Sequence, residues 1–313
     1  MWDCFRGGEK EMKKKHSSMS NRLFYLLNSI VWILVMVIVL YPLYLVLISS
    51  ISDPAAIRTG KVVLRPVDVF WGGYEAIFGY KELWVAYANS IFYTISHVIL
   101  SLIVTMMAGY AMADSRFFGR KVINLYFVIT MFFGGGLIPT FLTLRGVGLY
   151  NNRLIMIFMG CVSVWNLMLA RTYIQSSIPE ELYEASILDG ASHFQYFGKV
   201  VLPLSKTIIA VLAVYYGIGK WNDYFTGLVY FKDRSKYPLQ TILREILASL
   251  QTNMSGDFMI AMSENMEAYE EALNIAYVSK YCIIVVATVP VVILYLFVQK
   301  YFEKGVMIGS LKG

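Results

Sequence analysis

The chain has 313 residues, of which 58% are hydrophobic and only 15% are charged, and its formal net charge is +6. Soluble domains carry roughly 25% charged residues, so this composition excludes an ordinary water-soluble globule, a coiled coil and a disordered chain. The positive charge is better explained by basic flanks of membrane helices than by nucleic-acid binding. The three cysteines form no CxxC pair, which excludes a disulfide framework or a zinc site of that type.

Charged residues are missing from four long stretches of the chain. These stretches lie between Arg22 and Asp53, Glu82 and Asp114, Lys121 and Arg145, and Lys280 and Lys300, and they are 30, 31, 23 and 19 residues long. A helix that crosses a bilayer needs about 20 apolar residues. The sequence therefore predicts an all-α membrane protein with several transmembrane helices.

Residues 1–22 form a basic tail before the first apolar run. This run is longer than the 7–15 apolar residues of a signal peptide and lacks a small-residue cleavage site, so we expect a retained first span. A six-span membrane domain then covers residues 23–300, followed by a tail at 301–313. The six spans that we expect cover residues 23–50, 85–113, 122–142, 153–171, 203–224 and 279–300.

Six spans place both termini on the same side of the membrane. The loops and tails on that side hold 15 lysines and arginines in 80 residues, whereas those on the other side hold 10 in 101 residues. Positively charged loops stay in the cytoplasm, so we expect both termini to be cytoplasmic. The expected location is the plasma membrane, crossed several times.

Two loops are longer than tight turns between helices. The external loop, about residues 225–278, carries an acidic cluster (Glu264, Glu267, Glu270 and Glu271) that we expect to face an external partner protein. The cytoplasmic loop covers about residues 176–202. A loop of more than about 15 residues in a compact domain is usually functional or disordered.

The cytoplasmic loop has the pattern of two short helices. Pro179 suits the first position of a helix, and Glu180 and Glu181 in the first turn suit the helix dipole. Gly190 is placed to end this helix, and a second amphipathic piece carries Phe194 and Phe197. Small residues permit the close approach of a partner, but the residues alone equally allow an amphipathic connector that lies on lipid headgroups.

The same loop resembles the EAA signature of ABC importer permeases. The match lies in Glu184-Ala185-Ser186, in Asp189-Gly190-Ala191 and in Leu202-Pro203, with serine in place of the second alanine. In that family the loop forms a coupling helix that docks in a cleft of the cytoplasmic ATPase. The resemblance implies the type I ABC importer permease fold and assigns ATPase coupling to Glu184, Ala185, Ser186, Asp189, Gly190, Ala191, Leu202 and Pro203.

Other segments resemble the carbohydrate branch of these permeases, and in particular its maltose-type short permease. They are the Asn89-Ser90 pair, Trp221-Asn222-Asp223-Tyr224, and a C-terminal tail with Lys304, Gly305, Gly309 and Lys312. Residues Phe132–Thr140 resemble the subgroup that imports complex oligosaccharides, including uronate-containing ones. The resemblance covers about residues 20–313.

Three consecutive glycines, Gly134–Gly136, interrupt the expected third span. No Gly-Lys pair precedes Ser or Thr anywhere in the chain, so there is no Walker A phosphate loop. The glycines predict a helix break or a point of close packing. The functional alternative is an unwound segment that lines the transport pathway.

A group of polar and aromatic residues in and near the spans is the best candidate for contact with a sugar. The candidates are Asn89, Lys220, Trp221, Asn222, Asp223 and Tyr224. An ionisable residue inside a membrane is a functional hypothesis by default. Lys220 either attracts an anionic sugar or pairs with Asp223 three residues later, and His97 more simply has a structural role.

The resemblance implies a non-catalytic subunit that binds no cofactor, because ATP-Mg belongs to the partner ATPases. Its expected partners are a second permease subunit, two cytoplasmic ABC ATPases, an external sugar-binding protein, an oligosaccharide and membrane lipid, but no nucleic acid. A homodimeric ABC permease for a non-sugar solute is the alternative. An ATP-independent carrier is less favoured, because the sequence has no internal repeat.

Overall fold

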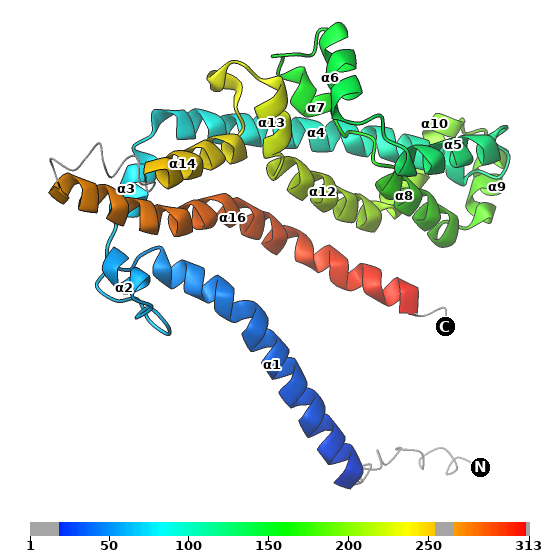
Figure 1. The fold of residues 1–313 in the computed structure, drawn as a ribbon. Coiled ribbons are helices and arrows are strands. Elements are labelled where there is room, and N and C mark those ends of the chain that lie inside the picture. The colour runs from blue at the N-terminus through cyan, green and yellow to red at the C-terminus, as the bar shows by residue number, and fades with distance from the viewer. Residues whose placement is uncertain (1–18, 254–265, 311–313) are drawn as a thin grey trace.

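The computed structural model describes residues 19–253 and 266–310, and these residues contain helices but no strand (Figure 1). An isolated bridge pairs Ser52 with Val69. In chain order the elements are α1 (Met19–Ser49), α2 (Pro54–Arg58), α3 (Gly72–Phe78), α4 (Lys81–Ala113), α5 (Arg120–Phe132), α6 (Leu137–Gly146), α7 (Leu154–Phe158), α8 (Val164–Ser177), α9 (Glu180–Leu188), α10 (His193–Tyr196), the π-helical turn η1 (Phe197–Val201), α11 (Leu202–Leu204), α12 (Lys206–Trp221), α13 (Tyr224–Tyr230), the 3-10 turn η2 (Arg234–Lys236), α14 (Leu239–Asn253) and α16 (Met266–Ser310).

Helix α4 is the central element of the fold. It runs almost the whole length of the helical layer in Figure 1 and packs against α7, α8, α12 and α14. Small residues allow its closest approach to α8, because a Cβ atom at Gly109 would lie only 3.0 Å from the Cβ atom of Ala170. Buried residues line α4 from Leu83 to Met112, so both ends of this helix are fixed by packing.

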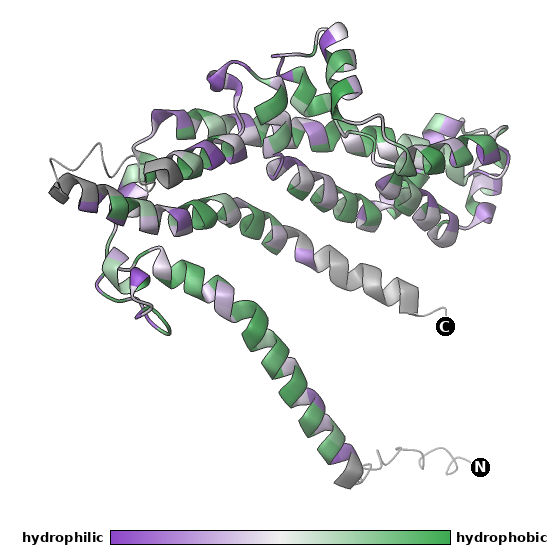
Figure 2. Ribbon diagram, in the orientation of Figure 1, coloured by the Kyte–Doolittle hydropathy of each residue, from purple (hydrophilic) through white to green (hydrophobic). Residues whose placement is uncertain are grey.

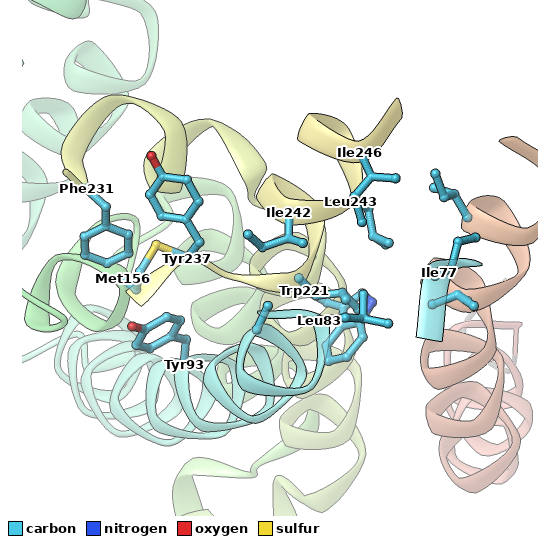
Figure 3. Close-up of a cluster of buried hydrophobic side chains, with 14 of the residues drawn as sticks. Ile77, Leu83, Tyr93, Met156, Trp221, Phe231, Tyr237, Ile242, Leu243 and Ile246 are labelled. Carbon is cyan, nitrogen blue, oxygen red and sulfur yellow. The ribbon is translucent and has the colours of Figure 1, made fainter. Parts of the chain in front are cut away.

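A first cluster of buried apolar side chains lies around the Lys81 end of α4 (Figure 3). Helix α14 contributes Leu239, Ile242, Leu243 and Ile246, which share one face at the spacing i, i+3, i+4, i+7. Tyr93, Met156, Trp221, Phe231 and Tyr237 come to the cluster from α4, α7, α12 and the segment before α14. The segment between α12 and α16 is therefore part of the packed core.

A second cluster lies around the Ala113 end of α4. Its buried members include Met106, Ala170, Ile174, Tyr196 and Leu212, which come from α4, α8, α10 and α12. The π-helical turn adds Val201. This second cluster is the platform from which the α9–α10 segment projects.

Helix α1 extends away from the other helices over most of its length (Figure 1) and is apolar along nearly all of it (Figure 2). None of its most apolar window is buried within this chain. Only its C-terminal end is held, because Ile48 packs with Ala56 and Val62 and the Tyr44 hydroxyl donates to the Leu64 carbonyl at 2.6 Å. An apolar helix without packing partners in its own chain suits a lipid or partner-subunit environment.

The structure confirms a helical membrane protein and alters the expected spans. Among the described residues, three helices are long and apolar enough to cross a membrane, or up to five if each of two bent pairs counts as one span. The expected third span is divided at the glycines into α5 and α6, which are bent by 116°. The predicted helix break is thus confirmed, whereas no atom lies within 4 Å of a Cβ built at Gly134 or Gly136. The alternative of close packing within this chain is not seen.

The helices that cover the expected fourth and fifth spans also differ from expectation, and those of the fourth, α7 and α8, are not among the candidate spans. The region 153–171 is divided into α7 and α8, and α8 continues to Ser177. Pro203 belongs to the bent helix before Lys206, and the longest helix in the expected fifth span runs from Lys206 to Trp221. The sixth is longer than expected, because α16 is helical from Met266 to Ser310 and includes Lys304, Gly305 and Gly309 in its backbone.

The expected external loop 225–278 is mostly helical, with α13, η2, α14 and the first turns of α16. The reason is the apolar face of α14, which can be buried only in a helix. Glu264 lies outside the described residues, as does Lys312 in the C-terminal tail. Glu270 and Glu271 are exposed near the start of α16.

The close contact of α4 with α8 leads to a stability prediction. Gly109→Val places methyl groups against Ala170 and the backbone of Arg171, so we expect a lower apparent Tm of the purified protein, with overpacking costing about 1–3 kcal/mol. Gly219→Val is the matched control, because nothing lies within 4 Å of a Cβ there. Equal melting temperatures of the two variants would contradict this account of the packing.

Candidate functional site

A break between α7 and α8 frees backbone groups that side chains of other helices then satisfy. Residues 159–163 are not helical, and Gly160 has φ +79°, a conformation that glycine adopts without strain. Lys220 of α12 donates to the Met159 carbonyl at 3.1 Å, and His97 Nδ1 of α4 hydrogen-bonds to the Ile157 carbonyl at 2.8 Å. The side chains of Lys220 and His97 therefore hold the non-helical segment in place.

Tyr216 hydrogen-bonds to the other end of the same break. Its hydroxyl accepts from the Ser163 amide at 3.3 Å and lies 2.7 Å from the Thr105 hydroxyl. Irregular backbone at membrane depth is tolerated only where it is buried in protein or lines a water-filled cavity. The break satisfies the first condition through α4 and α12.

An open pocket of about 330 Å³ adjoins this break. It is lined by His97, Met159, Gly160, Ser163, Asn166, Tyr215, Tyr216, Gly219, Lys220 and Asp223. Hydroxyl, amide, imidazole, ammonium and carboxylate groups therefore converge beside aromatic rings, which is a suitable lining for a polar solute such as a sugar.

Lys220 is not an isolated cation. Its ammonium group lies 2.9 Å from Asp223 Oδ2, and Lys220 as a whole is only 7% exposed. Asp223 also accepts from the Thr226 amide at 3.0 Å and so caps α13. The structure therefore brings together the pair that the i, i+3 spacing offered as the structural alternative. The ammonium still has a third hydrogen to donate, because only two acceptors are recorded for it.

The other sugar-contact candidates do not join this pocket. Asn89 is buried and donates to the carbonyls of Ser235 and Tyr237 at 2.8 and 3.1 Å, so it fixes the start of α14. Trp221 is buried in the first cluster and donates to the Ala287 carbonyl at 3.1 Å. Asn222 and Tyr224 are exposed, with Arg244 stacked 4.5 Å from the Tyr224 ring.

The α9–α10 segment has the two short helices that the sequence predicts. Pro179 precedes α9 as its cap, one residue earlier than expected, and Glu180 and Glu181 form its first turn. Gly190 follows the cap residue Asp189 with φ +73°, the conformation expected at a helix end. Ser192 and Gln195 form a capping box that starts α10.

Most of the coupling candidates lie on the exposed surface of this segment. Glu184, Ala185, Asp189 and Gly190 are exposed, while Ser186, Ala191 and Leu202 are half-buried and Pro203 is exposed. Leu188 and Phe194 beside them are 89% and 79% exposed. Two large apolar side chains left in solvent at a cluster of small residues mark a surface that suits a protein partner.

Sequence reasoning missed the residues that anchor this segment, because they lie in the turn after α4. The guanidinium carbon of Arg116 lies 3.5 Å from the ring centroid of Tyr183 in α9, and Arg116 Nε donates to Asp114 at 2.8 Å. Partial burial opposes ionisation of Asp114, but hydrogen bonds from Arg116 outweigh it and lower the pKa of this carboxyl group. The pair is therefore intact at neutral pH and weakens only as the pH falls through that lowered pKa.

The ties at the break predict different effects for two substitutions of Lys220. Lys220→Met leaves Asp223 without its cation and the Met159 carbonyl without its donor, so we expect about 1–3 kcal/mol lower stability. Lys220→Gln can still donate to Met159 and should melt at a higher temperature than Lys220→Met. Thermal unfolding of the purified protein measures both, and a Lys220→Met variant as stable as the parent chain would show that these bonds are not structural.

Comparisons with known proteins agree with this architecture. Residues 84–308 match the family model described as binding-protein-dependent transport system inner membrane component. The chain is 32% identical to the polygalacturonan/rhamnogalacturonan transport system permease protein YtcP of Bacillus subtilis, over 94% of this chain and 100% of that protein. It is 28% identical to the arabinooligosaccharides transport system permease protein AraQ of Halalkalibacterium halodurans, over 88% and 92% of the two chains.

A solved structure supports the same assignment. A chain in the crystal structure of a bacterial ABC transporter involved in the import of the acidic polysaccharide alginate is 34% identical, with a TM-score of 0.77 over 91% of this chain and 98% of that one. The family match covers well over half of the residues, and the helical, apolar fold fits it. This chain therefore belongs to the family of binding-protein-dependent transport system inner membrane components, the membrane-spanning permease subunits of ABC importers.

Proposed function

We propose that this chain is one permease subunit of an ATP-driven importer of uronate-containing oligosaccharides. The observation that carries the proposal is the pair of relatives named for acidic polysaccharides, polygalacturonan/rhamnogalacturonan and alginate, at 32% and 34% identity over more than nine tenths of this chain. Relatives named for sugars favour this cargo over a homodimeric permease for a non-sugar solute.

The assembly in this proposal has the subunits typical of binding-protein-dependent import. A second permease subunit supplies the other half of the pathway, two cytoplasmic ATPases bind ATP-Mg, and an external sugar-binding protein delivers the oligosaccharide. Six spans with both termini in the cytoplasm place the α9–α10 segment on the ATPase side and α13–α14 on the external side. Alternating access follows when ATP binding moves the α9–α10 segment.

The pocket at the α7–α8 break lies on the sugar's path in this proposal. Broken helices near the middle of the membrane are where transporters commonly bind their substrates. The remaining N–H of the Lys220 ammonium group can donate to a uronate carboxylate, and the exposed Tyr215 offers a ring face to the sugar's C–H groups. A neutral sugar gains only the second contact.

A substitution of Gly190 tests whether the ATPases dock on the α9–α10 segment. Gly190→Leu forces a side chain into a left-handed conformation that costs about 1–2 kcal/mol and covers the surface beside Leu188. We expect loss of ATPase copurification and of uptake, with normal insertion of the permease in the membrane. Gly190→Asn is the control, because asparagine tolerates this conformation and should retain more of both activities. Unchanged uptake by the Gly190→Leu variant would contradict a role of the α9–α10 segment in ATPase coupling.

Substitutions of Lys220 test whether the transported sugar is acidic. In proteoliposomes with the complete importer, Lys220→Met and Lys220→Gln should lower uptake of a uronate oligosaccharide by about tenfold, the equivalent of one charge-assisted hydrogen bond. Uptake of a neutral oligosaccharide of the same length should fall less, after correction for the amount of folded protein. Lys206→Gln, an exposed lysine at the other end of α12, is the control. Equal losses for both sugars would mean that Lys220 acts only on the fold.

A further inference from the structure

Helix α9 is held to the rest of the chain by very few contacts. It contains no buried residue, and Tyr183 is its only side chain that packs against the second cluster. The Tyr183 ring meets Tyr196 edge-on at 5.2 Å, and Tyr196 is buried in that cluster. Apart from its chain connections to α8 and α10, α9 therefore contacts the second cluster through this one side chain.

The other face of the Tyr183 ring is covered by Arg116. The 3.5 Å separation of the guanidinium carbon from the ring centroid is well inside the range of about 6 Å for a cation–π contact. Arg116 follows the last residue of α4 by three positions and is fixed there by the bonds from its backbone amide and Nε to Asp114, at 2.9 and 2.8 Å. The Tyr183 ring is thus clamped between the end of α4 and α10.

Space around the clamp shows that the contact is local. A pocket of about 310 Å³ separates the start of α9 from the ends of α4 and α8, and Tyr110, Asp114, Arg116, Gln175, Glu180 and Tyr183 are among its lining residues. Close packing, which would transmit a displacement over a wide surface, is therefore missing there. What bridges the gap from α9 to α4 is the stacked Arg116–Tyr183 pair.

We propose that the contact between Arg116 and Tyr183 is the joint through which movement of α9 is passed to α4. This inference rests on the proposed docking of an ATPase on the α9–α10 segment. The far half of α4 holds the start of α14 through Asn89, as described above, and through the Ser90 hydroxyl, which accepts from the Leu239 amide at 2.7 Å. A displacement of α4 at the joint consequently reaches both the pocket beside His97 and the α14 end of the fold.

The test measures oligosaccharide taken up per ATP hydrolysed by the complete importer in proteoliposomes. Arg116→Gln removes the cation, and Tyr183→Leu removes the ring while keeping an apolar side chain. Each should lower the uptake-to-hydrolysis ratio by about 3- to 10-fold, the range expected for one cation–π contact, while the ATPases still copurify with the permease. The conservative variants Tyr183→Phe and Arg116→Lys preserve a ring and a cation and should keep the ratio within about twofold of the parent importer.

Two further variants make the result specific to the joint. Lys121→Gln removes a positive charge at the start of α5, from an exposed side chain that makes no hydrogen bond or ion pair among the described residues, and should leave the ratio unchanged. The double variant Arg116→Gln with Tyr183→Leu should lose no more than the more affected single variant, because both act through one contact.

Three results would contradict the proposed role of this contact. They are an uptake-to-hydrolysis ratio unchanged by both single variants, a loss in the double variant equal to the product of the two single losses, or loss of ATPase copurification with Arg116→Gln. The last result would mean that Arg116 shapes the docking surface instead of passing on its movement. Failure of the proposed function is recognised separately, since Gly190→Leu would then retain both copurification and uptake. If Gly190→Leu abolishes both while Arg116→Gln changes nothing, only the joint is wrong.

Discussion

The constraint on which this structure depends is that every backbone polar group at membrane depth needs a hydrogen-bond partner. An unbroken helix meets this need within itself, but the helix that would cover residues 153–171 is broken at 159–163. The freed groups are satisfied by His97, Tyr216 and Lys220, from two other helices. The same three side chains line the polar pocket beside the break.

That requirement gives one set of residues two roles. Lys220 holds the break through Met159, is neutralised by Asp223, and is one of the residues that line the pocket. Burying an ion pair costs desolvation energy that its mutual attraction offsets only with good geometry and additional hydrogen bonds. The bonds to Met159 and from Thr226 to Asp223 supply that geometry, so the pair is stable in the wall of the pocket.

The sequence predicted the features that depend on local composition. Charge-free stretches located α1 and α4 to within a few residues, and Gly190 marked the end of α9 because few other residues adopt its backbone conformation. The break at Gly134–Gly136 followed from the glycines themselves. Helix α14 has the helical spacing of apolar residues in its sequence, but the whole region was expected to be an external loop. The residues with this spacing are Leu239, Ile242, Leu243 and Ile246.

Features that depend on distant contacts could not be predicted. The break after Phe158 has a single glycine as a local signal, and its partners are about 60 residues away on each side. The same holds for Arg116 and Tyr183, which meet only because α4 and α8 end beside each other. Asn89 and Trp221 matched sugar-permease patterns by sequence, but the structure commits their polar groups to backbone carbonyls.

The most direct test of the account is a structure of the assembled importer trapped with a uronate oligosaccharide in its membrane pathway. The account predicts sugar density beside residues 159–163, with a carboxylate within hydrogen-bond distance of the Lys220 ammonium group and the Lys220–Asp223 pair preserved. Sugar density confined to a region that Lys220, Tyr215 and Tyr216 do not reach would contradict it, because the pocket at the break would then have a structural role alone.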